Sequence, residues 1–193
     1  MIDFPEVAQR IQNGLISRLA TGFDSWVYVF EGTDIDQVKA IKWYGPLCAY
    51  LEPEKVGDLL ALYKQAHSEV DTWVNTHRME VRIDEKAFPI RSVVPIEEIS
   101  VDMDEIPLSS SPFVTGKNLY EYVLDNYPLE TREYIINDLR RQLDEMSEKI
   151  MRGLSYKGIC LDLANLKMVK DANSEIYIVV TDLCAGLFAL EKM

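Results

Sequence analysis

Four polar side chains lie where an apolar strand or a helix is expected to end. Lys42 closes the apolar stretch Ala40-Ile41-Lys42, and an ammonium in that position must reach water or meet an anion. Asp162 and Asn165 follow the longest helical stretch, and Asp182 directly follows an apolar run. Carboxylate and amide oxygens are suitable ligands for Mg²⁺, and lysine is a common contact for phosphate oxygens. Together these residue types could hold a metal-bound polyphosphate.

Each of these residues also has an interpretation that needs no ligand. Lys42 can extend its ammonium to solvent along an apolar stem. Asp182 can be a solvated loop acid or the N-cap of a helix. Taken singly, each residue leaves both interpretations open.

The elements that must position them begin with strands. The β-forming run 26–30 and the stretch 38–44, separated by a break at Gly32, predict a hairpin that ends at Gly45-Pro46. Before it, apolar residues four apart over residues 6–19 predict a short leading helix or the approach to a first strand. After it, apolar spacings of three and four predict a helix over 53–76.

Strands give way to helices in the second half. Further strands are predicted over 78–83, 89–101 and 106–114, with "VDMDE" as the turn between the last two. Short and long helices are predicted over 119–127 and 129–154, the second with an apolar stripe of Ile135, Leu139, Leu143, Met146, Ile150 and Leu154. A hairpin of 166–169 and 176–180 follows. This order predicts an α+β protein with a waist near 112–118.

Composition limits the classes of protein. The chain has 193 residues and a net charge of −12, so nonspecific binding to nucleic acid or to an anionic membrane surface is disfavoured. No apolar run reaches the roughly 18 residues of a membrane span, and the N-terminus lacks the apolar core of a signal peptide. Cys48, Cys160 and Cys184 are widely spaced, which favours free thiols. We therefore expect a cytoplasmic protein.

The order of these elements and residues resembles the protein-kinase-like superfamily, and most of all its aminoglycoside- and choline-kinase-type phosphotransferases. The resemblance runs from about Leu19 to about Gly186. It implies a two-lobed fold: an N-lobe of antiparallel β-sheet with one helix over 1–112, a hinge over 113–118, and a truncated, minimal helical C-lobe over 119–193 without the substrate-binding helices. It also implies ATP and Mg²⁺ as cofactors.

In the N-lobe, the resemblance assigns nucleotide-binding roles residue by residue. The family's glycine-rich loop, G-x-G-x-x-G-x-V, aligns with residues 20–27, where only the middle glycine, Gly22, remains, together with Ser25 and Val27. Lys42 would contact the α- and β-phosphates and act in catalysis, and Glu69 on the following helix would pair with it. Without the other motifs, Gly22 would be an ordinary hairpin turn and Glu69 a solvated acid.

In the rest of the chain, the resemblance assigns adenine contacts and the catalytic loop. Phe113, Val114 and Thr115 would offer their backbone to adenine, although the same segment could be an ordinary strand-to-helix loop. Asp162 would be the catalytic aspartate that positions an acceptor hydroxyl. Asn165 and Asp182 would be the metal ligands.

The chain also departs from the family pattern. Cys160 replaces the loop histidine, so the polar contacts that brace the loop are expected to be absent. Asp162 and Asn165 are three residues apart, whereas the family spacing is five, and Cys184 replaces the glycine of the D-F-G triplet. Only eleven residues follow Asp182.

Without the family's later helices, one face of the helix 129–154 should be partly exposed. We expect Tyr134, Met151 and Tyr156 to be available on that face. A homodimer or a protein partner would then cover it.

Three functions remain open from the sequence. The chain could be an ATP-binding, Mg²⁺-dependent phosphotransferase of low rate, with an unidentified acceptor. It could instead be a catalytically inactive pseudokinase that acts as a nucleotide-binding or protein-interaction scaffold. In the third, the chain binds no nucleotide, and Lys42, Glu69 and Asp182 form a buried charge network.

Overall fold

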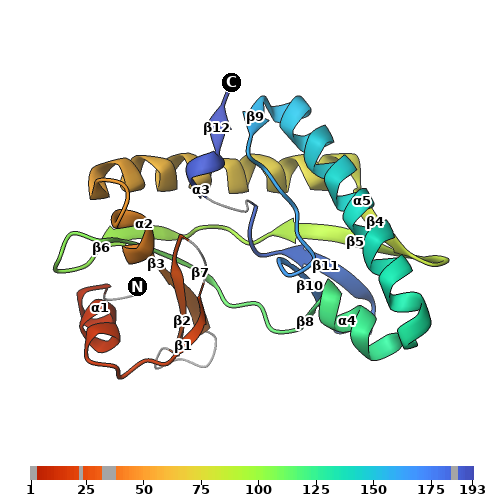
Figure 1. The fold of residues 1–193 in the computed structure, drawn as a ribbon, viewed down its shortest axis with the longest axis horizontal. Helices are drawn as coiled ribbons and strands as arrows, with labels where there is room; N and C mark the ends of the chain where they lie inside the picture. Colours follow the sequence, from red (N-terminus) through yellow and green to blue (C-terminus); the bar gives the residue numbers. More distant parts are fainter. Residues whose placement is uncertain (1–3, 22–23, 32–37, 184–186) are drawn as a thin grey trace. The chain divides into compact units, whose positions relative to one another are not determined.

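The chain divides into two compact units in the computed structural model, which describes residues 4–21, 24–31, 38–183 and 187–193 (Figure 1). Unit 1 comprises residues 1–64, 95–113 and 186–188, and unit 2 comprises residues 65–94, 114–185 and 189–193. The junction at Phe113–Val114 falls inside the hinge predicted over 113–118. Residues 65–94, however, group with unit 2 rather than with the other residues up to 112.

Unit 1 is built on a five-stranded antiparallel sheet of order β1-β2-β3-β7-β6. Its elements are α1 (Phe4–Gln12), β1 (Arg18–Thr21), β2 (Trp26–Glu31), β3 (Val38–Trp43), α2 (Gly45–Cys48), β6 (Glu98–Val101) and β7 (Pro107–Pro112). Side chains alternate across a strand, so one face carries Tyr28, Ile41 and Leu108, which form a core with Val7 of α1. The other face carries the residues between them, including Lys42.

Helix α3 (Pro53–His77) begins in unit 1 and continues into unit 2, and Figure 1 draws it as one unbroken helix. It confirms the helix predicted over 53–76. Its residues Val56, Leu60, Tyr63, Ala66, Val70 and Val74 are buried. The spacings of three and four in the sequence therefore mark the buried stripe of this helix.

Unit 2 contains a second five-stranded sheet, of order β4-β5-β11-β10-β8. Its elements are β4 (Glu80–Ile83), β5 (Lys86–Val93), β8 (Lys117–Asn118), α4 (Leu119–Asn126), α5 (Leu129–Leu154), β9 (Tyr156–Lys157), β10 (Leu166–Lys170), β11 (Ile176–Val180) and β12 (Glu191–Lys192). The 3₁₀ turn η1 (Leu187–Ala189) begins in unit 1 and ends in unit 2. Strands β10 and β11 form the predicted hairpin, in register from Leu166↔Val180 to Lys170↔Ile176. Strand β5 pairs with β11 in parallel.

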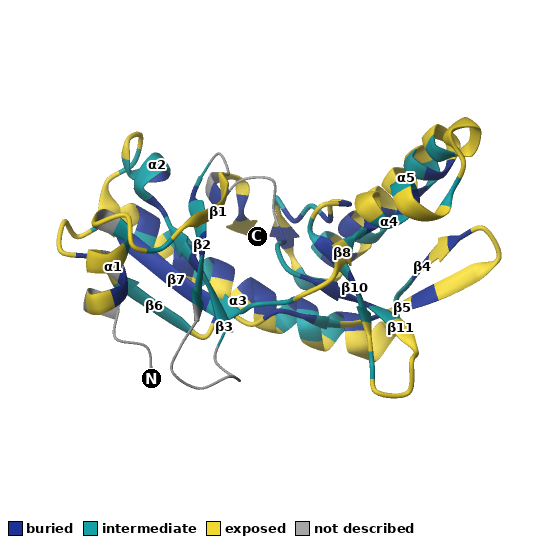
Figure 2. Cartoon of the chain, turned by 90° about the horizontal axis from the view of Figure 1, so that it is seen from below, coloured by how far each residue is buried: buried dark blue, intermediate teal, exposed yellow. Residues whose placement is uncertain are grey.

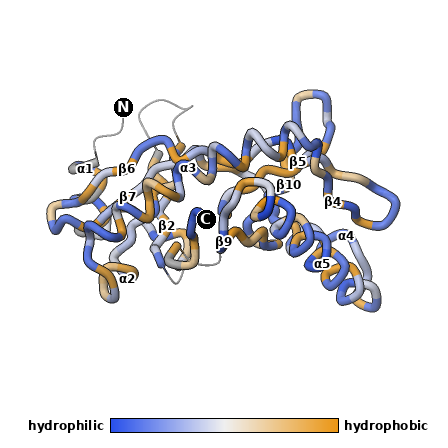
Figure 3. Tube along the Cα trace, turned by 90° about the horizontal axis from the view of Figure 1, so that it is seen from above, coloured by the Kyte–Doolittle hydropathy of each residue, from blue (hydrophilic) through white to orange (hydrophobic). Residues whose placement is uncertain are grey.

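Helices α4 and α5 confirm the two helices predicted for the second half. Asn118 caps α4 in a capping box with Glu121, and α5 ends at Ser155 in the left-handed conformation. The buried residues of α5 are Ile135, Leu139, Leu143, Ser147 and Ile150. Figure 2 shows the opposite, exposed face of the helix, and Figure 3 shows that many residues along the helix are hydrophilic.

One strand prediction was wrong. The strand predicted over 89–101 is two strands, because β5 ends at Val93 and β6 begins at Glu98; Pro95, which has no backbone N–H, lies in the break. Strands β4 and β5 form a hairpin in the unit 2 sheet, where β5 also pairs with β11. The leading helix is shorter than the stretch 6–19, with β1 starting at Arg18.

Within the described ranges, no helix combines the length and the apolar character that crossing a membrane would require.

Candidate functional site

Lys42 lies on the face of the unit 1 sheet that points away from the α1 core. It is directly opposite Val27 of β2 and Ser109 of β7. Its ammonium lies 5.7 Å from the ring centroid of Tyr63, which is buried on α3, close enough for a cation–π attraction. The side chain is half-buried, so the charge is held at a defined place on the sheet.

The other predicted residues of unit 1 lie around the same hairpin. Ser25 is buried, with 8% of its surface exposed, and directly precedes β2. Val27 shares the face of Lys42, because the two residues are paired across β2 and β3. Gly22 lies outside the described residues, as does Cys184 of unit 2.

The predicted hinge residues continue from the end of β7. The backbone N–H of Phe113 donates to the carbonyl of Val38 at 3.1 Å, which extends the β3–β7 pairing by one bond. Val114 is half-buried and Thr115 is exposed. Their role as contacts for adenine stays a prediction.

Glu69 has its described contacts within unit 2. Its carboxylate accepts from the ammonium of Lys192 at 2.8 Å and from the side-chain amide of Gln65 at 2.7 Å. The hydrogen bond from Lys192 lowers the pKa of Glu69 more than burial raises it, and the same bond raises the pKa of Lys192. The predicted pairing of Glu69 with Lys42 stays a prediction. Lys192 is 123 residues away from Glu69, and no local pattern indicates this pairing.

The hairpin β10–β11 brings the backbone of the two predicted metal ligands to one end of the unit 2 sheet. The carbonyl of Asn165 accepts from the N–H of Thr181 at 2.7 Å and from its hydroxyl at 3.0 Å. Asp182 is the next residue, and its carboxylate accepts from the N–H of Leu183 at 2.9 Å. Both side chains are half-buried.

This arrangement suits a hard cation that is only partly held by protein. In the described part of the chain, no three His, Cys, Asp or Glu side chains gather as a metal site. Mg²⁺ needs no such group, since it is typically held by one or two carboxylates together with water and phosphate oxygens. Asn165 and Asp182 are oxygen donors of that kind, so the residues present fit this metal.

The loop 160–165 is braced by hydrogen bonds that the sequence did not reveal. The N–H of Cys160 donates to the carbonyl of Leu183 at 2.7 Å, and the N–H of Leu161 donates to the hydroxyl of Ser147 at 2.9 Å. The carbonyl of Leu163 accepts from the N–H of Leu119 at 3.1 Å. These bonds are donated by backbone N–H groups, so they brace the loop without a histidine, and the expected absence of that histidine's own contacts is not contradicted. The available signal was a serine on the apolar stripe of α5.

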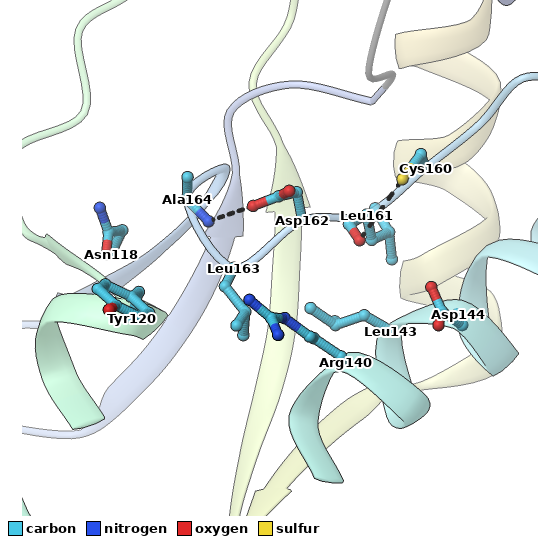
Figure 4. A pocket seen from close by; sticks show the side chains of 10 residues that line it. All are labelled: Asn118, Tyr120, Arg140, Leu143, Asp144, Cys160, Leu161, Asp162, Leu163 and Ala164. Atoms are coloured by element: carbon cyan, nitrogen blue, oxygen red, sulfur yellow. Dashed lines mark hydrogen bonds between the residues drawn. The ribbon is translucent and has the colours of Figure 1, made fainter. Parts of the chain in front are cut away.

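Asp162 is an exposed residue of this loop, as is Ala164. One carboxylate oxygen accepts from the N–H of Ala164 at 2.7 Å, which closes a tight turn. The residue also lines a cavity of about 340 Å³ together with residues of α4 and α5 (Figure 4). Asp162 is thus fixed by its own loop and remains accessible from a cavity.

The order of elements and residues decides the kind of fold. A lysine lies on the third strand of a sheet of order β1-β2-β3-β7-β6, and α3 follows it. A short helix, a long helix, a loop with Asp162 and Asn165, a hairpin and Asp182 come later, as the family resemblance implies. The fold is protein-kinase-like.

Solved structures of kinase domains align with this kinase-like chain at low identity. A double mutant of the Mycobacterium tuberculosis PknI kinase domain is 14% identical with a TM-score of 0.46, covering 88% of this chain and 57% of that one. Rad53 in complex with AMP-PNP is 15% identical with a TM-score of 0.48, covering 89% and 38%. The chain therefore spans less than two thirds of the length of either structure. No family profile and no curated protein matches the sequence.

The residues predicted to be available on one face of α5 differ in their exposure. Tyr134 is 76% exposed and Met151 is half-buried. Tyr156 is fully buried, with the ammonium of Lys192 5.0 Å from its ring centroid, so its predicted exposure was wrong. The homodimer or protein partner stays a prediction.

Proposed function

We propose that this chain binds ATP with Mg²⁺ and is a kinase-like phosphotransferase of low rate. Lys42 contacts the α- and β-phosphates, and Asn165 and Asp182 bind the metal. Ser25, Val27 and the backbone of 113–115 contact the nucleoside. The observation that carries the proposal is the hairpin β10–β11, at whose end the carbonyl of Asn165 accepts from the N–H of Thr181, the residue before Asp182.

Asp162 supplies the group that the transfer step needs. A base that accepts the proton of an acceptor hydroxyl must come within about 3 Å of it. Asp162 is exposed at a cavity and has its orientation set by Ala164, which supports this role. Because catalysis of phosphoryl transfer is mostly positioning and charge neutralisation, a shortened loop is compatible with slow turnover.

A pseudokinase that binds nucleotide without transferring phosphate is the second candidate. It is supported by Glu69, whose carboxylate is hydrogen-bonded to Lys192 and Gln65. In active kinases the corresponding glutamate orients the lysine. If Lys192 keeps Glu69, Lys42 still attracts phosphate but is less well oriented for catalysis.

Thermal unfolding with and without ATP and MgCl₂ tests nucleotide binding. Ligand at about 100 times its dissociation constant should stabilise the chain by about 2.7 kcal/mol. Asp182→Asn should abolish the part of the ATP-induced stabilisation that depends on Mg²⁺. Lys42→Ala should reduce the stabilisation by ATP both with and without Mg²⁺. Asp58→Asn and Lys149→Ala remove the same charges from exposed helix positions and should leave the shift unchanged. A chain that melts at the same temperature with and without Mg²⁺-ATP refutes the proposal.

ATP turnover then separates the two candidates. In the enzyme, Asp162→Asn should lower the rate of ATP consumption at least about a hundredfold, since positioned proton transfer contributes roughly 10²–10⁴. The thermal shift with Mg²⁺-ATP should remain. Wild-type protein that binds Mg²⁺-ATP and consumes none of it supports the pseudokinase.

A further inference from the structure

The cavity beside Asp162 lies wholly within unit 2 and has a mixed lining. The loop contributes residues 160–164, the start of α4 contributes Asn118 and Tyr120, and α5 contributes Arg140, Leu143 and Asp144. Leu143 and Leu163 are buried and give it an apolar wall. Its volume of about 340 Å³ is at the lower end of the range for small-molecule sites.

Arg140 is the only cation among the residues that line this cavity. Figure 4 shows its side chain extending from α5 toward Leu163. Its neighbour Arg141 pairs with Asp138 at 2.6 Å and with Glu145 at 2.8 Å. Among the described residues, no ion pair between Arg140 and an acidic side chain is found. A guanidinium without an ion pair, in a chain of net charge −12, is a ready contact for a ligand carboxylate.

Two carboxylates face the same cavity from different elements. Asp144 lies one turn beyond Arg140 on α5, and Asp162 comes from the loop. Burial, and then the charges of Asp162 and Asp144, raise the pKa of the Cys160 thiol, so both acids act on one neighbouring group. The cavity thus offers one positive group and two negative groups on an apolar wall.

We propose that this cavity binds a small zwitterion that carries a hydroxyl group, such as a hydroxy amino acid. Arg140 pairs with its carboxylate and Asp144 with its ammonium, which leaves the hydroxyl for Asp162. A purely cationic ligand would leave Arg140 unpaired, and a purely anionic one would meet both acids.

The role of the hydroxyl rests on the proposed function. The hydroxyl oxygen forms a bond to the γ-phosphorus of ATP as the bond from that phosphorus to the bridging oxygen breaks. ADP leaves, and Asp162 accepts the hydroxyl proton. Binding of the zwitterion to Arg140 and Asp144 does not itself require nucleotide.

Calorimetric titration of the full chain with L-homoserine and L-serine, without nucleotide, tests the site. Arg140→Gln should weaken binding about tenfold or more, because a charge-assisted hydrogen bond is lost. Arg141→Gln removes the same charge from the adjacent position and should leave binding unchanged. Asp144→Asn should weaken it similarly, and Glu145→Gln, one residue further along α5, should not. Circular dichroism confirms that each variant is folded.

Three results would overturn the inference. The first is that neither amino acid binds the folded wild-type chain. The second is that Arg141→Gln weakens binding as much as Arg140→Gln does. The third is that choline binds as tightly as L-homoserine and that its binding is unaffected by Arg140→Gln. The proposed function can fail separately. If the zwitterion binds, Arg140→Gln weakens that binding, and the chain does not bind Mg²⁺-ATP, then the zwitterion site is supported and the kinase role is refuted. If the chain binds Mg²⁺-ATP and no zwitterion, then nucleotide binding is supported and the zwitterion site is refuted.

Discussion

Two buried serines have opposite surroundings. The hydroxyl of Ser147 donates to the carbonyl of Leu143 at 2.8 Å and accepts from the N–H of Leu161 at 2.9 Å. Ser110 is 1% exposed, and its hydroxyl has no hydrogen-bond partner among the described residues. Ser147 connects α5 to the loop of Asp162. Ser110 instead buries a hydroxyl in the unit 1 sheet with no described hydrogen bond to offset the loss of hydration.

Alanine at these two positions should therefore have effects of opposite sign. Ser147→Ala leaves the N–H of Leu161 without its acceptor and should lower the free energy of unfolding by about 1–3 kcal/mol. Ser110→Ala removes an uncompensated hydroxyl and should leave stability unchanged or raise it by up to about 1 kcal/mol. Urea denaturation followed by circular dichroism measures both. Equal losses at the two positions would contradict the described hydrogen bonds.

Side-chain roles at this scale could be proposed only where a motif suggests them. Lys42, Asp162, Asn165 and Asp182 could be proposed as site residues because they lie near the ends of recognisable strands and helices, and their roles stay predictions. Ser147 has no such mark, because its partner is a backbone N–H 14 residues away, and the sequence does not say which N–H groups would otherwise stay unsatisfied.

At the scale of elements, the short strand β8 depends on a glycine that precedes it. Gly116 has φ of +136°, and a Cβ there would lie 2.5 Å from the carbonyl oxygen of Met168. Met168 pairs with Lys117 where β8 joins β10. The close approach of backbone to backbone at this point requires glycine.

Gly116→Ala should therefore destabilise unit 2. The strained φ alone costs about 1–3 kcal/mol, and the clash with a backbone carbonyl adds to it. Gly57→Ala is the matched control, since Gly57 is inside α3 with no atom within 4 Å of the added Cβ; it should stabilise the helix by about 0.5–1 kcal/mol. The free energy of unfolding of both variants gives the comparison, and a neutral Gly116→Ala would show that β8 does not need this contact.

Local patterns predicted elements better than they predicted pairing. The helices α3, α4 and α5 and the hairpin β10–β11 follow from apolar spacing and turn residues. The parallel pairing of β5 with β11 joins Ile90 to Ile178, and no local pattern indicates a partner so distant in sequence. The place of the hairpin β4–β5 in the unit 2 sheet was therefore not predicted.

For the whole molecule, charge pairing matters because acids exceed bases by twelve. As pH falls, protonation of carboxylates reduces the general repulsion but also removes individual ion pairs. The pair of Lys192 with Glu69 connects β12 to α3, and both groups have shifted pKa values. The hydrogen bond from Lys192 lowers the pKa of Glu69, and the hydrogen bond to Glu69 raises that of Lys192.

The two shifts predict a window of pH for this contact. Glu69 contributes stability that is present above its unfolded pKa of about 4.5 and is lost as pH falls through its lower folded pKa. Lys192 contributes stability that is present below about 10.5 and is lost as pH rises through its higher folded pKa. The difference in unfolding free energy between the wild type and Lys192→Met should thus be largest between about pH 5 and pH 10 and should shrink on both sides.

Two controls test whether this window comes from the ion pair. Lys149→Met, which removes an equal charge from an exposed position of α5, should show no such window. In a Glu69→Gln background, the effect of Lys192→Met should no longer depend on pH in this way. A difference that is constant from pH 3 to pH 11 would mean that Lys192 acts through its contact with Tyr156 rather than through its ion pair with Glu69.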